Sequence, residues 1–568
     1  MRTGSWAFFG VVLLAAGASA SACSSSFAGS GGSAGSGEAE AGACDRNECG
    51  DAGQAGAKPT VDPSGDAGSS GAADDPGPPA CVPVGKGDSP DDGFVDSNCD
   101  GIDGDKSKAV FVSPDGDDGF EGGFASPVKT FAKAIELASE QHKDVYVCVG
   151  EYADNIVIDT KPVSVFGGYD CADWSRGNAR PKVAPATGVA LTIKNVSDLT
   201  IDRMAFASDA ATNPGGSSVA VMVVTSTDVH LSHAQVDAGA GAPGVSGAPT
   251  NAVTTSAKRG ADGQDSAACN LYLDGCKQSQ PKGGAAALTM CGPTTVRGGY
   301  GGAGATKLVT PPLPGIGLAG LPGGRKSGAS GAPAKAGNAG SAGPTGFGSV
   351  DAEGYEPSNG GEDGALGAVG ESGGGGDGGL ACNYYDADAK TCQSSIAINN
   401  GSSWWGGGGG QGGYGGCGGI GGHGGGGGGA SIAVLSISST LTISWASLST
   451  STGGVGGAPS DGAFGQPGGA GGKGGRPAAN NLASFADVTG GQHGGYGADG
   501  GKGGPGGPGA GGPSITIVAL GDIPVTQAVT LTPAAGGKGA VGLDGKDATS
   551  GESADVKAIP VLAPSDGT

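Results

Sequence analysis

Two aligned stretches decide the fold of this chain: residues 190–206, ALTIKNVSDLTIDRMAF, and residues 220–236, AVMVVTSTDVHLSHAQV. When one is written above the other, apolar residues coincide repeatedly along the alignment. The matched pairs are Leu191 with Val221, Ile193 with Val223, Leu199 with Val229, Ile201 with Leu231, and Phe206 with Val236. One copy cannot bury its own apolar face, whereas stacked copies form a continuous core.

Further copies follow later in the chain. A third, IAVLSISSTLTISWASL, begins at Ile432, and a weaker fourth begins at Ile515. The third copy matches through Leu435, Leu441, Ile443 and Leu448. Short strands in sequential coils with few helices predict an all-β fold of the parallel β-helix type. The apolar positions should face its lumen, and the Ser, Thr and Asp residues between them should face solvent.

The region before the repeats carries signals for strands and for one helix. Ser126 as N-cap and Pro127 at the first helical position predict a helix over residues 127–140. Its apolar face would contain Val128, Phe131, Ile135 and Ala138. Short strands are predicted at residues 110–112, 145–149, 156–158 and 163–166.

Glycine dominates the rest of the chain: 125 of 568 residues are glycine, whereas about 7% is usual. Glycine-rich runs begin at Ala238, Gly453 and Gly536, each directly after a repeat copy. The runs should therefore leave from the same corner of the coil and lie beside one another. Two structures fit them: packed extended polyglycine helices, or disordered loops, which composition alone favours.

The first residues read as an export signal. Arg2 precedes a short apolar run, so residues 1–22 are predicted to be a signal peptide. The stretch Ala20-Ser21-Ala22-Cys23 resembles a bacterial lipobox, which implies acylation of Cys23 and anchorage in a lipid bilayer. The alternative is ordinary cleavage, with Cys23 as a disulfide partner. If Cys23 is acylated, residues 23–80, which are rich in Ser, Gly, Ala, Asp and Pro, are the lipid anchor and a disordered linker.

The charge of the chain limits its partners. Its formal net charge is −23, which argues against nucleic acid and anionic membrane surfaces and suits divalent cations.

Thirteen cysteines are present, and setting Cys23 aside leaves twelve. Export favours disulfide bonds, and zinc is disfavoured because no CxxC pair occurs. Several of the cysteines lie close in sequence, namely Cys44 with Cys49, Cys269 with Cys276 and Cys382 with Cys392. The full candidate set is Cys44, Cys49, Cys81, Cys99, Cys148, Cys171, Cys269, Cys276, Cys382 and Cys392.

The acidic loop, residues 81–106, is the candidate calcium site. Asp96, Asn98 and Asp100 alternate before a glycine, as in calcium loops of the D-x-[DN]-x-[DN]-G type. Ser107 stands where such loops have a bidentate Glu, so Asp103 or Asp105 would have to substitute. The predicted ligands are Asp96, Asn98, Asp100, Ile102 through its carbonyl, Asp103 and Asp105. The alternative is a solvated acidic turn held by Cys99.

Catalytic residues are not assigned. Asp198 and Asp228 occupy equivalent positions in the first two copies, and Asp202 and Arg203 lie nearby. Their side chains are interpreted as solvent-facing turn residues rather than as an acid–base pair. Two histidines, His230 and His233, should face opposite sides of a strand. The aromatic residues Trp404, Trp405 and Tyr414 would either stack on a sugar or pin a loop, and pinning is favoured.

The order of elements between residues 110 and 174 resembles the opening of bacterial β-helix surface proteins of the pectin-lyase-like superfamily. The matching stretches are FVSPDGDDG, ASPVKTFAKAIELA, VYVCVGEY and VSVFGGYDCADW. This resemblance implies a right-handed coil whose N-terminal end is capped by the helix at residues 127–140. The glycine-rich remainder resembles PGRS-type glycine-rich repeat proteins. Neither resemblance implies a known activity.

The predicted organisation continues with the β-helix at 107–237, glycine-rich insertions at 238–429 and 453–513, coils at 430–452 and 514–535, and a glycine-rich tail at 536–568. The expected function is that of a non-enzymatic lipoprotein scaffold, structural or adhesive, at the outer membrane or cell surface. It would contact extracellular polysaccharide or envelope components. The alternatives are a polysaccharide lyase or glycoside hydrolase of the β-helix type, and a calcium-dependent carbohydrate-binding protein.

Overall fold

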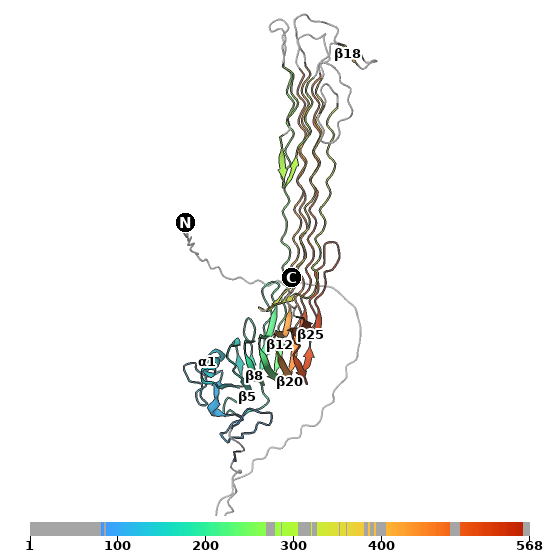
Figure 1. Ribbon diagram of the computed structural model, residues 1–568. Coiled ribbons are helices and arrows are strands. Elements are labelled where there is room, and N and C mark those ends of the chain that lie inside the picture. The colour runs from blue at the N-terminus through green and yellow to red at the C-terminus, as the bar shows by residue number, and fades with distance from the viewer. Residues whose placement is uncertain are drawn as a thin grey trace, which may run out of the picture. The chain divides into compact units, whose positions relative to one another are not determined.

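The protein is nearly all β, with parallel sheets and a single α-helix in the described part of the chain (Figure 1). The structure is a computed structural model that describes residues 81–83, 87–267, 279–285, 287–304, 320, 326–351, 353–358, 360–379, 384–386, 391–393, 405–477 and 489–560. The predicted signal peptide (1–22), Cys23 and the predicted linker (23–80) lie outside the described residues.

Three parallel sheets contain most of the strands, and we call them together the sheet body. From β2 onward, the chain adds one strand to each sheet in turn before it returns to the first. The first sheet contains, in order, β1 (Ala109–Val112), β2 (Asp144–Cys148), β5 (Val165–Tyr169), β8 (Ser197–Asp202), β11 (Thr227–Ser232), β20 (Leu441–Ser444) and β23 (Val525–Gln527). The second contains β4 (Ile156–Asp159), β7 (Leu191–Lys194), β10 (Ser218–Val224), β19 (Ser431–Ile437), β22 (Ser514–Leu520) and β25 (Ser553–Ile559). The third contains β3 (Glu151–Tyr152), β6 (Lys182–Val183), β9 (Ala205–Ala207), β12 (Gln235–Ala238), β21 (Ser447–Thr450) and β24 (Thr530–Thr532).

The register of these sheets confirms the first repeat alignment, since all five predicted apolar pairs are direct strand neighbours. The third copy differs in one strand. Its alignment would place Leu435 opposite Val223, whereas the structure pairs Leu435 with Met222. The turn after β19 is one residue shorter than the turn after β10, which shifts the register. Leu435 therefore packs in a second cluster with Ile432 and Val518, apart from the main core.

The single α-helix starts later than predicted. Helix α1 spans Phe131–Gln141, and its N-cap is Thr130, whose hydroxyl accepts a hydrogen bond from the Lys133 N–H. The prediction of a start at Pro127 was wrong because Val128 is extended and bridges to Val112 of β1. Phe131, Ala134 and Ala138 are fully buried, and α1 packs against β1, β2 and β4.

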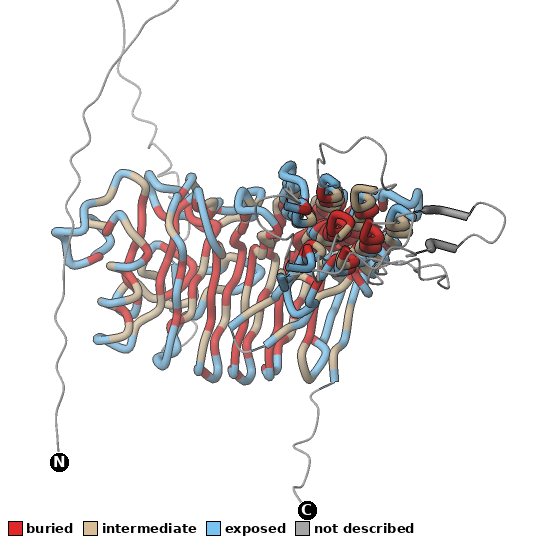
Figure 2. The backbone as a smooth tube through the Cα atoms, turned by 90° about the horizontal axis from the view of Figure 1, so that it is seen from above, coloured by how far each residue is buried: buried red, intermediate tan, exposed pale blue. Residues whose placement is uncertain are grey.

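The glycine-rich segments run side by side as extended chains, and we call them the glycine bundle (Figures 1 and 2). It comprises residues 239–267, 326–346, 360–379, 405–430, 451–477, 489–513 and 536–551. Neighbouring segments are joined by backbone hydrogen bonds at every third residue: Gly413, Gly416 and Gly419 donate to Gly495, Ala498 and Gly501. A three-residue period is that of a polyproline-II-type helix. Of the two structures that fitted the composition, the described residues adopt the packed one.

The central segment, residues 405–430, is nearly pure glycine because neighbours surround it. It donates to segments 239–267 and 489–513 and accepts from segments 360–379 and 451–477. A Cβ on Gly419 would lie 2.0 Å from the Ala463 carbonyl oxygen, and a Cβ on Gly418 would lie 1.7 Å from that of Gly367. Side chains are therefore confined to every third position, namely Gln411, Tyr414, Cys417, Ile420 and His423.

The long insertions leave the sheet body at one corner, as predicted. Each connects a strand of the third sheet to the next strand of the second: β12 to β19, β21 to β22, and β24 to β25. The segments are neighbours in the bundle, which confirms that they lie beside one another. Strand β25 was missed, because residues 536–568 were predicted to be only a glycine-rich tail, yet β25 pairs in parallel with β22.

Short antiparallel hairpins interrupt the insertions. They are β13 (Thr289–Cys291) with β14 (Thr294–Val296), β15 (Ser349–Val350) with β16 (Tyr355–Glu356), and β17 (Tyr384–Asp386) with β18 (Thr391–Gln393). Phe347, Val350 and Tyr355, in and beside the β15–β16 hairpin, pack against the apolar cluster that contains Leu435. This packing fastens the longest insertion to the second sheet.

We expect Gly457→Ala to destabilise the bundle, because its new Cβ would lie 2.0 Å from the Val245 carbonyl oxygen. Overpacking of this kind costs about 1–3 kcal/mol, measurable as a lower denaturant midpoint by circular dichroism. The matched control is Ala458→Val at the adjacent exposed position, which should change stability by less than about 0.5 kcal/mol. Equal losses for the two variants would contradict the tight packing.

Candidate functional site

Disulfide bonds are present, as the sequence predicted. Cys81 is bonded to Cys99 and Cys148 to Cys171. A third bond joins Cys291 to Cys417 across 126 residues of sequence; it was not predicted, because only the packing of the bundle brings these residues together. The side chains of Cys44, Cys49, Cys269, Cys276, Cys382 and Cys392 lie outside the described residues.

The acidic loop brings Asp96, Asn98 and Asp100 into one turn. The Asp96 carboxylate accepts the N–H groups of Asp100 at 3.1 Å and of Gly101 at 2.7 Å. The Asn98 side chain accepts the Asp100 N–H at 2.9 Å through its oxygen and donates to the Asp100 carboxylate at 3.0 Å. These three side chains supply oxygen atoms of the type that calcium prefers.

The other predicted ligands have different partners. Asp103 is buried and forms an ion pair with Arg176 at 2.9 Å. Asp105 caps the short 3₁₀ helix at Lys106–Lys108 by accepting the Ser107 N–H. Ile102 has a buried side chain. Within the described residues, no group of three or more His, Cys, Asp or Glu side chains is arranged to hold a metal ion. Calcium binding by this loop stays a prediction.

A buried ion network fastens the acidic loop to the first sheet. Arg176 has no exposed side-chain surface and bridges the Asp103 carboxylate at 2.9 Å and the Asp202 carboxylate at 2.5 Å. Asp202 also pairs with Arg203 at 2.7 Å, and Arg203 reaches Asp92 at 2.9 Å. Arg176 and Arg203 each join a carboxylate of the acidic loop to Asp202 of strand β8, and Arg176 is the more deeply buried of the two.

The pKa values of the two buried carboxyl groups of this network, Asp103 and Asp202, are shifted in opposite directions. Burial raises the pKa of Asp103, and the hydrogen bond and charge of Arg176 oppose that rise. Burial acts in the same direction on Asp202, but hydrogen bonds from Ser232 and His233, together with the two arginines, outweigh it and lower its pKa. Asp202 is therefore held as a carboxylate.

This arrangement is poorly suited to proton transfer. The Asp202 oxygens accept from Ser232 at 2.6 Å, from His233 at 2.9 Å and from both arginines. A carboxylate with a lowered pKa and this many donors is a weak general base. The interpretation of Asp202 and Arg203 as solvent-facing turn residues was wrong, because both side chains are buried in this network. The network itself was missed because its members are up to 111 residues apart in sequence.

The remaining candidates lie in or directly after strands β8, β11 and β20. Asp198 and Asp228 occupy matching positions of β8 and β11, as predicted, and both are exposed. His230 lies 3.0 Å from Asp228, whereas His233 bonds Asp202, so the two histidines have separate partners. Trp445 is 61% exposed, and its ring lies parallel to that of His233 with centroids 6.4 Å apart.

Tyr414 pins a hairpin instead of offering a stacking surface. Its ring is buried, and its hydroxyl bonds the backbone N–H and carbonyl of Ala287. Trp404 lies outside the described residues.

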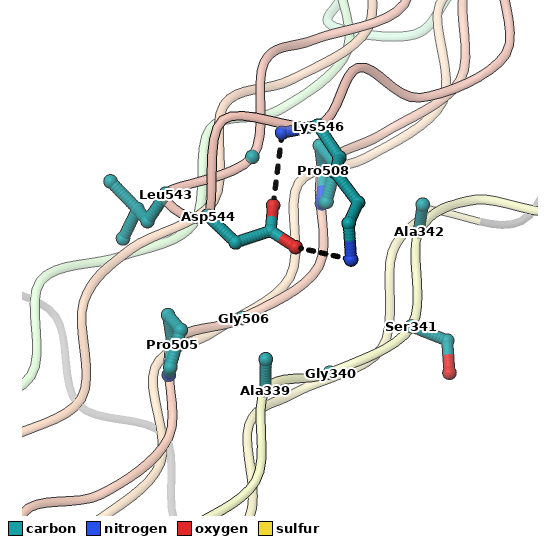
Figure 3. A pocket seen from close by; sticks show the side chains of 11 residues that line it. Ala339, Gly340, Ser341, Ala342, Pro505, Gly506, Pro508, Leu543, Asp544 and Lys546 are labelled. Carbon is teal, nitrogen blue, oxygen red and sulfur yellow. Dashed lines mark hydrogen bonds and ion pairs between the residues drawn. The ribbon is translucent and has the colours of Figure 1, made fainter.

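Figure 3 shows a pocket of about 280 Å³ on the glycine bundle. Its walls are backbone and small or cyclic side chains, with Leu543 at one side. The charged groups there, Asp544 and Lys546, pair with each other at 3.3 Å. The lining residues are Ala339, Gly340, Ser341, Ala342, Pro505, Gly506, Pro508, Gly542, Leu543, Asp544 and Lys546. The lining therefore offers apolar contacts and two charges that already pair with each other. It does not place a nucleophile next to a base.

No protein-family model, curated protein or solved structure matches this chain. In the described part of the chain, no helix is long and apolar enough to cross a membrane.

We expect Arg176→Met to lower the free energy of unfolding by about 3–5 kcal/mol, because two buried carboxylates would lose their shared partner. Urea unfolding followed by circular dichroism would measure the loss. Arg180→Met is the matched control, since Arg180 is exposed. If the free energy of unfolding falls no further than in the control, the ion pairs of Arg176 do not stabilise the attachment of the loop to the sheet.

Proposed function

We propose that this protein is an exported, non-enzymatic surface scaffold in which a parallel β-helix carries an ordered bundle of glycine-rich helices. The observation that supports this most directly is the hydrogen-bonding of the bundle, where glycines bond neighbouring chains at every third residue. Such a bundle is stiff, because every chain is restrained by its neighbours. Stiffness suits a spacer or a contact surface better than it suits a catalytic loop.

We further propose that the three sheets form the faces of a right-handed parallel β-helix. It is supported by the strand order, in which successive coils add one strand to each parallel sheet. The position of α1, whose buried Phe131 packs against the first strands, suits a cap at the N-terminal end of the stack.

Anchorage through acylated Cys23 would attach the scaffold to the outer membrane or cell surface. The signal-like residues 1–22 and the lipobox-like Ala20–Cys23 stretch support it. The residue after Cys23 is Ser24 and not an Asp, which favours the outer membrane, and the disulfides found among the described residues suit an oxidising compartment. The partners in this proposal are the lipid bilayer and envelope components or extracellular polysaccharide.

Carbohydrate binding is the second candidate function, with or without calcium and turnover. The exposed Trp445 ring beside His233 favours it, because an aromatic face next to polar groups is a common sugar-stacking surface. A lyase or hydrolase would in addition need a free acid–base pair, and Asp202 is committed to its ion network. The scaffold is therefore the better-supported function.

The anchor is tested by expressing the full chain with its own signal in a Gram-negative host and labelling with palmitate. We expect label on the mature chain, recovery with outer membranes, and loss of both in Cys23→Ala. Cys44→Ala is the control and should keep the label. An unlabelled mature chain in the soluble fraction would refute the lipoprotein assignment and leave the fold unaffected.

Calcium should stabilise the mature chain through the acidic loop. A site of weak extracellular grade, with a dissociation constant near 10⁻⁴–10⁻³ M, would add about 1.4–2.7 kcal/mol at 10 mM calcium. The readout is thermal unfolding with calcium and then with chelator. Asp96→Ala should abolish the shift, and Asp117→Ala, outside the loop, should keep it. Identical midpoints with and without calcium would exclude the site.

A further inference from the structure

One side of the central segment of the glycine bundle is only partly occupied by neighbouring chain. Gly409 and Gly412 donate their N–H groups to the carbonyls of Gly302 and Gly299, at 2.7 and 2.9 Å. The same three-residue row continues through Gly415, Gly418, Gly421 and Gly424. The chain that fills its first part leaves at the β13–β14 hairpin, which the Cys291–Cys417 disulfide fixes in place.

Beyond that hairpin no backbone carbonyl of the described residues accepts a hydrogen bond from the row. Side chains take two of its N–H groups: Ser372 accepts from Gly415 at 3.0 Å, and Asp363 accepts from Gly424 at 2.8 Å. The N–H groups of Gly418 and Gly421 have no hydrogen-bond partner in the described part of the chain, and no backbone donor reaches their carbonyls there. Gly421 is nevertheless buried. Buried backbone groups are rarely left unpaired.

Exposed apolar side chains flank these unpaired groups. Ile420 is 52% exposed and Leu366 is 68% exposed. The two lie at the same level on adjacent segments, because the Gly367 N–H donates to the Gly419 carbonyl. We call Gly418, Gly421, Ile420 and Leu366 together the open row.

We propose that the open row binds an extended glycine-rich chain of another protein, in the polyproline-II conformation and with glycine at every third residue. The occupant is defined by continuity with the filled part of the row. There, a Cβ on Gly298 or Gly301 would lie 1.9–2.0 Å from a carbonyl oxygen of the central segment. A chain that extends this contact needs glycine at the same spacing, and its carbonyls would accept the two free N–H groups.

The proposal concerns binding alone and does not depend on export, lipidation or calcium. The test uses the mature full chain and a fluorescent nine-residue peptide, (Gly-Gly-Ser)₃, whose binding is followed by anisotropy. We expect saturable binding and slower amide hydrogen exchange over residues 417–424. The peptide (Ala-Ala-Ser)₃ should not bind, because it has a Cβ at every position, including each third position where a Cβ would meet a carbonyl oxygen.

Two surface variants place the binding on the bundle. Ile420→Arg should weaken it at least tenfold, whereas Val455→Arg, at a residue 47% exposed on segment 451–477, should leave it unchanged. Absence of binding, equal binding of the alanine peptide, or equal effects of the two variants would each overturn the proposal. Self-association of the chain that Ile420→Arg abolishes, without peptide binding, would also overturn it by making a second copy the occupant.

Discussion

The close approach of glycine-rich backbones is the constraint on which the insertions of this protein depend. In the central segment, residues 405–430, each turn of three residues has neighbours on several sides. A Cβ at most of its glycines would lie within about 2 Å of a carbonyl oxygen. Side chains are thus excluded from two positions in three. The GGx pattern of the sequence follows from the packing and from the three-residue period.

The conformational entropy lost when this bundle forms is large, because glycine loses more conformational freedom on folding than any other residue. Each backbone hydrogen bond contributes only about 0.5–1.5 kcal/mol net. The bundle therefore depends on having many bonds formed together. It also depends on the attachment of four of its segments, at one end each, to strands that are ordered by ordinary side-chain burial, namely β12, β19, β21 and β22.

The edges of the bundle use polar side chains where a neighbouring chain is missing. Asp461 accepts the N–H of Gly462, Asp499 that of Gly468, and Asp363 that of Gly424. Pro505 and Pro508 stand where no N–H has to be donated, while their carbonyls accept from Gly340 and Gly343. The acidic residues and prolines scattered through the glycine-rich segments therefore have structural positions, which composition alone does not show.

The sequence was a good guide wherever side chains carry the structure. The pairs Leu191 with Val221 and Leu199 with Val229 were predictable, because strand period and apolar matching both depend on side-chain burial. Leu435 was misplaced because one shortened turn shifts a whole strand, which an ungapped alignment misses. Composition favoured disorder for the insertions because it counts apolar side chains to bury, whereas the bundle packs backbone on backbone.

The candidate site was predictable only in its local part. The turn made by Asp96, Asn98 and Asp100 is visible in their spacing, since all three lie within five residues. The partner of Asp103 is Arg176, 73 residues later, and that contact exists only once β8 and the acidic loop are in place. Prediction of the loop as an isolated unit counted Asp103 among the calcium ligands and could not show its ion pair with Arg176.

The sheet body also explains how insertions without any apolar pattern reach one arrangement. Gln235 of β12 pairs with Ser447 of β21, and beyond these strands Gly241 donates to Thr452 and Gly244 to Val455. The offset of the hydrogen bonds in the bundle thus continues the parallel register of the sheet. Adjacent strands are about 4.8 Å apart, so the segments leave the sheet already within hydrogen-bonding reach of one another. Side-chain burial in the sheet body therefore selects the register, and the glycine backbones propagate it.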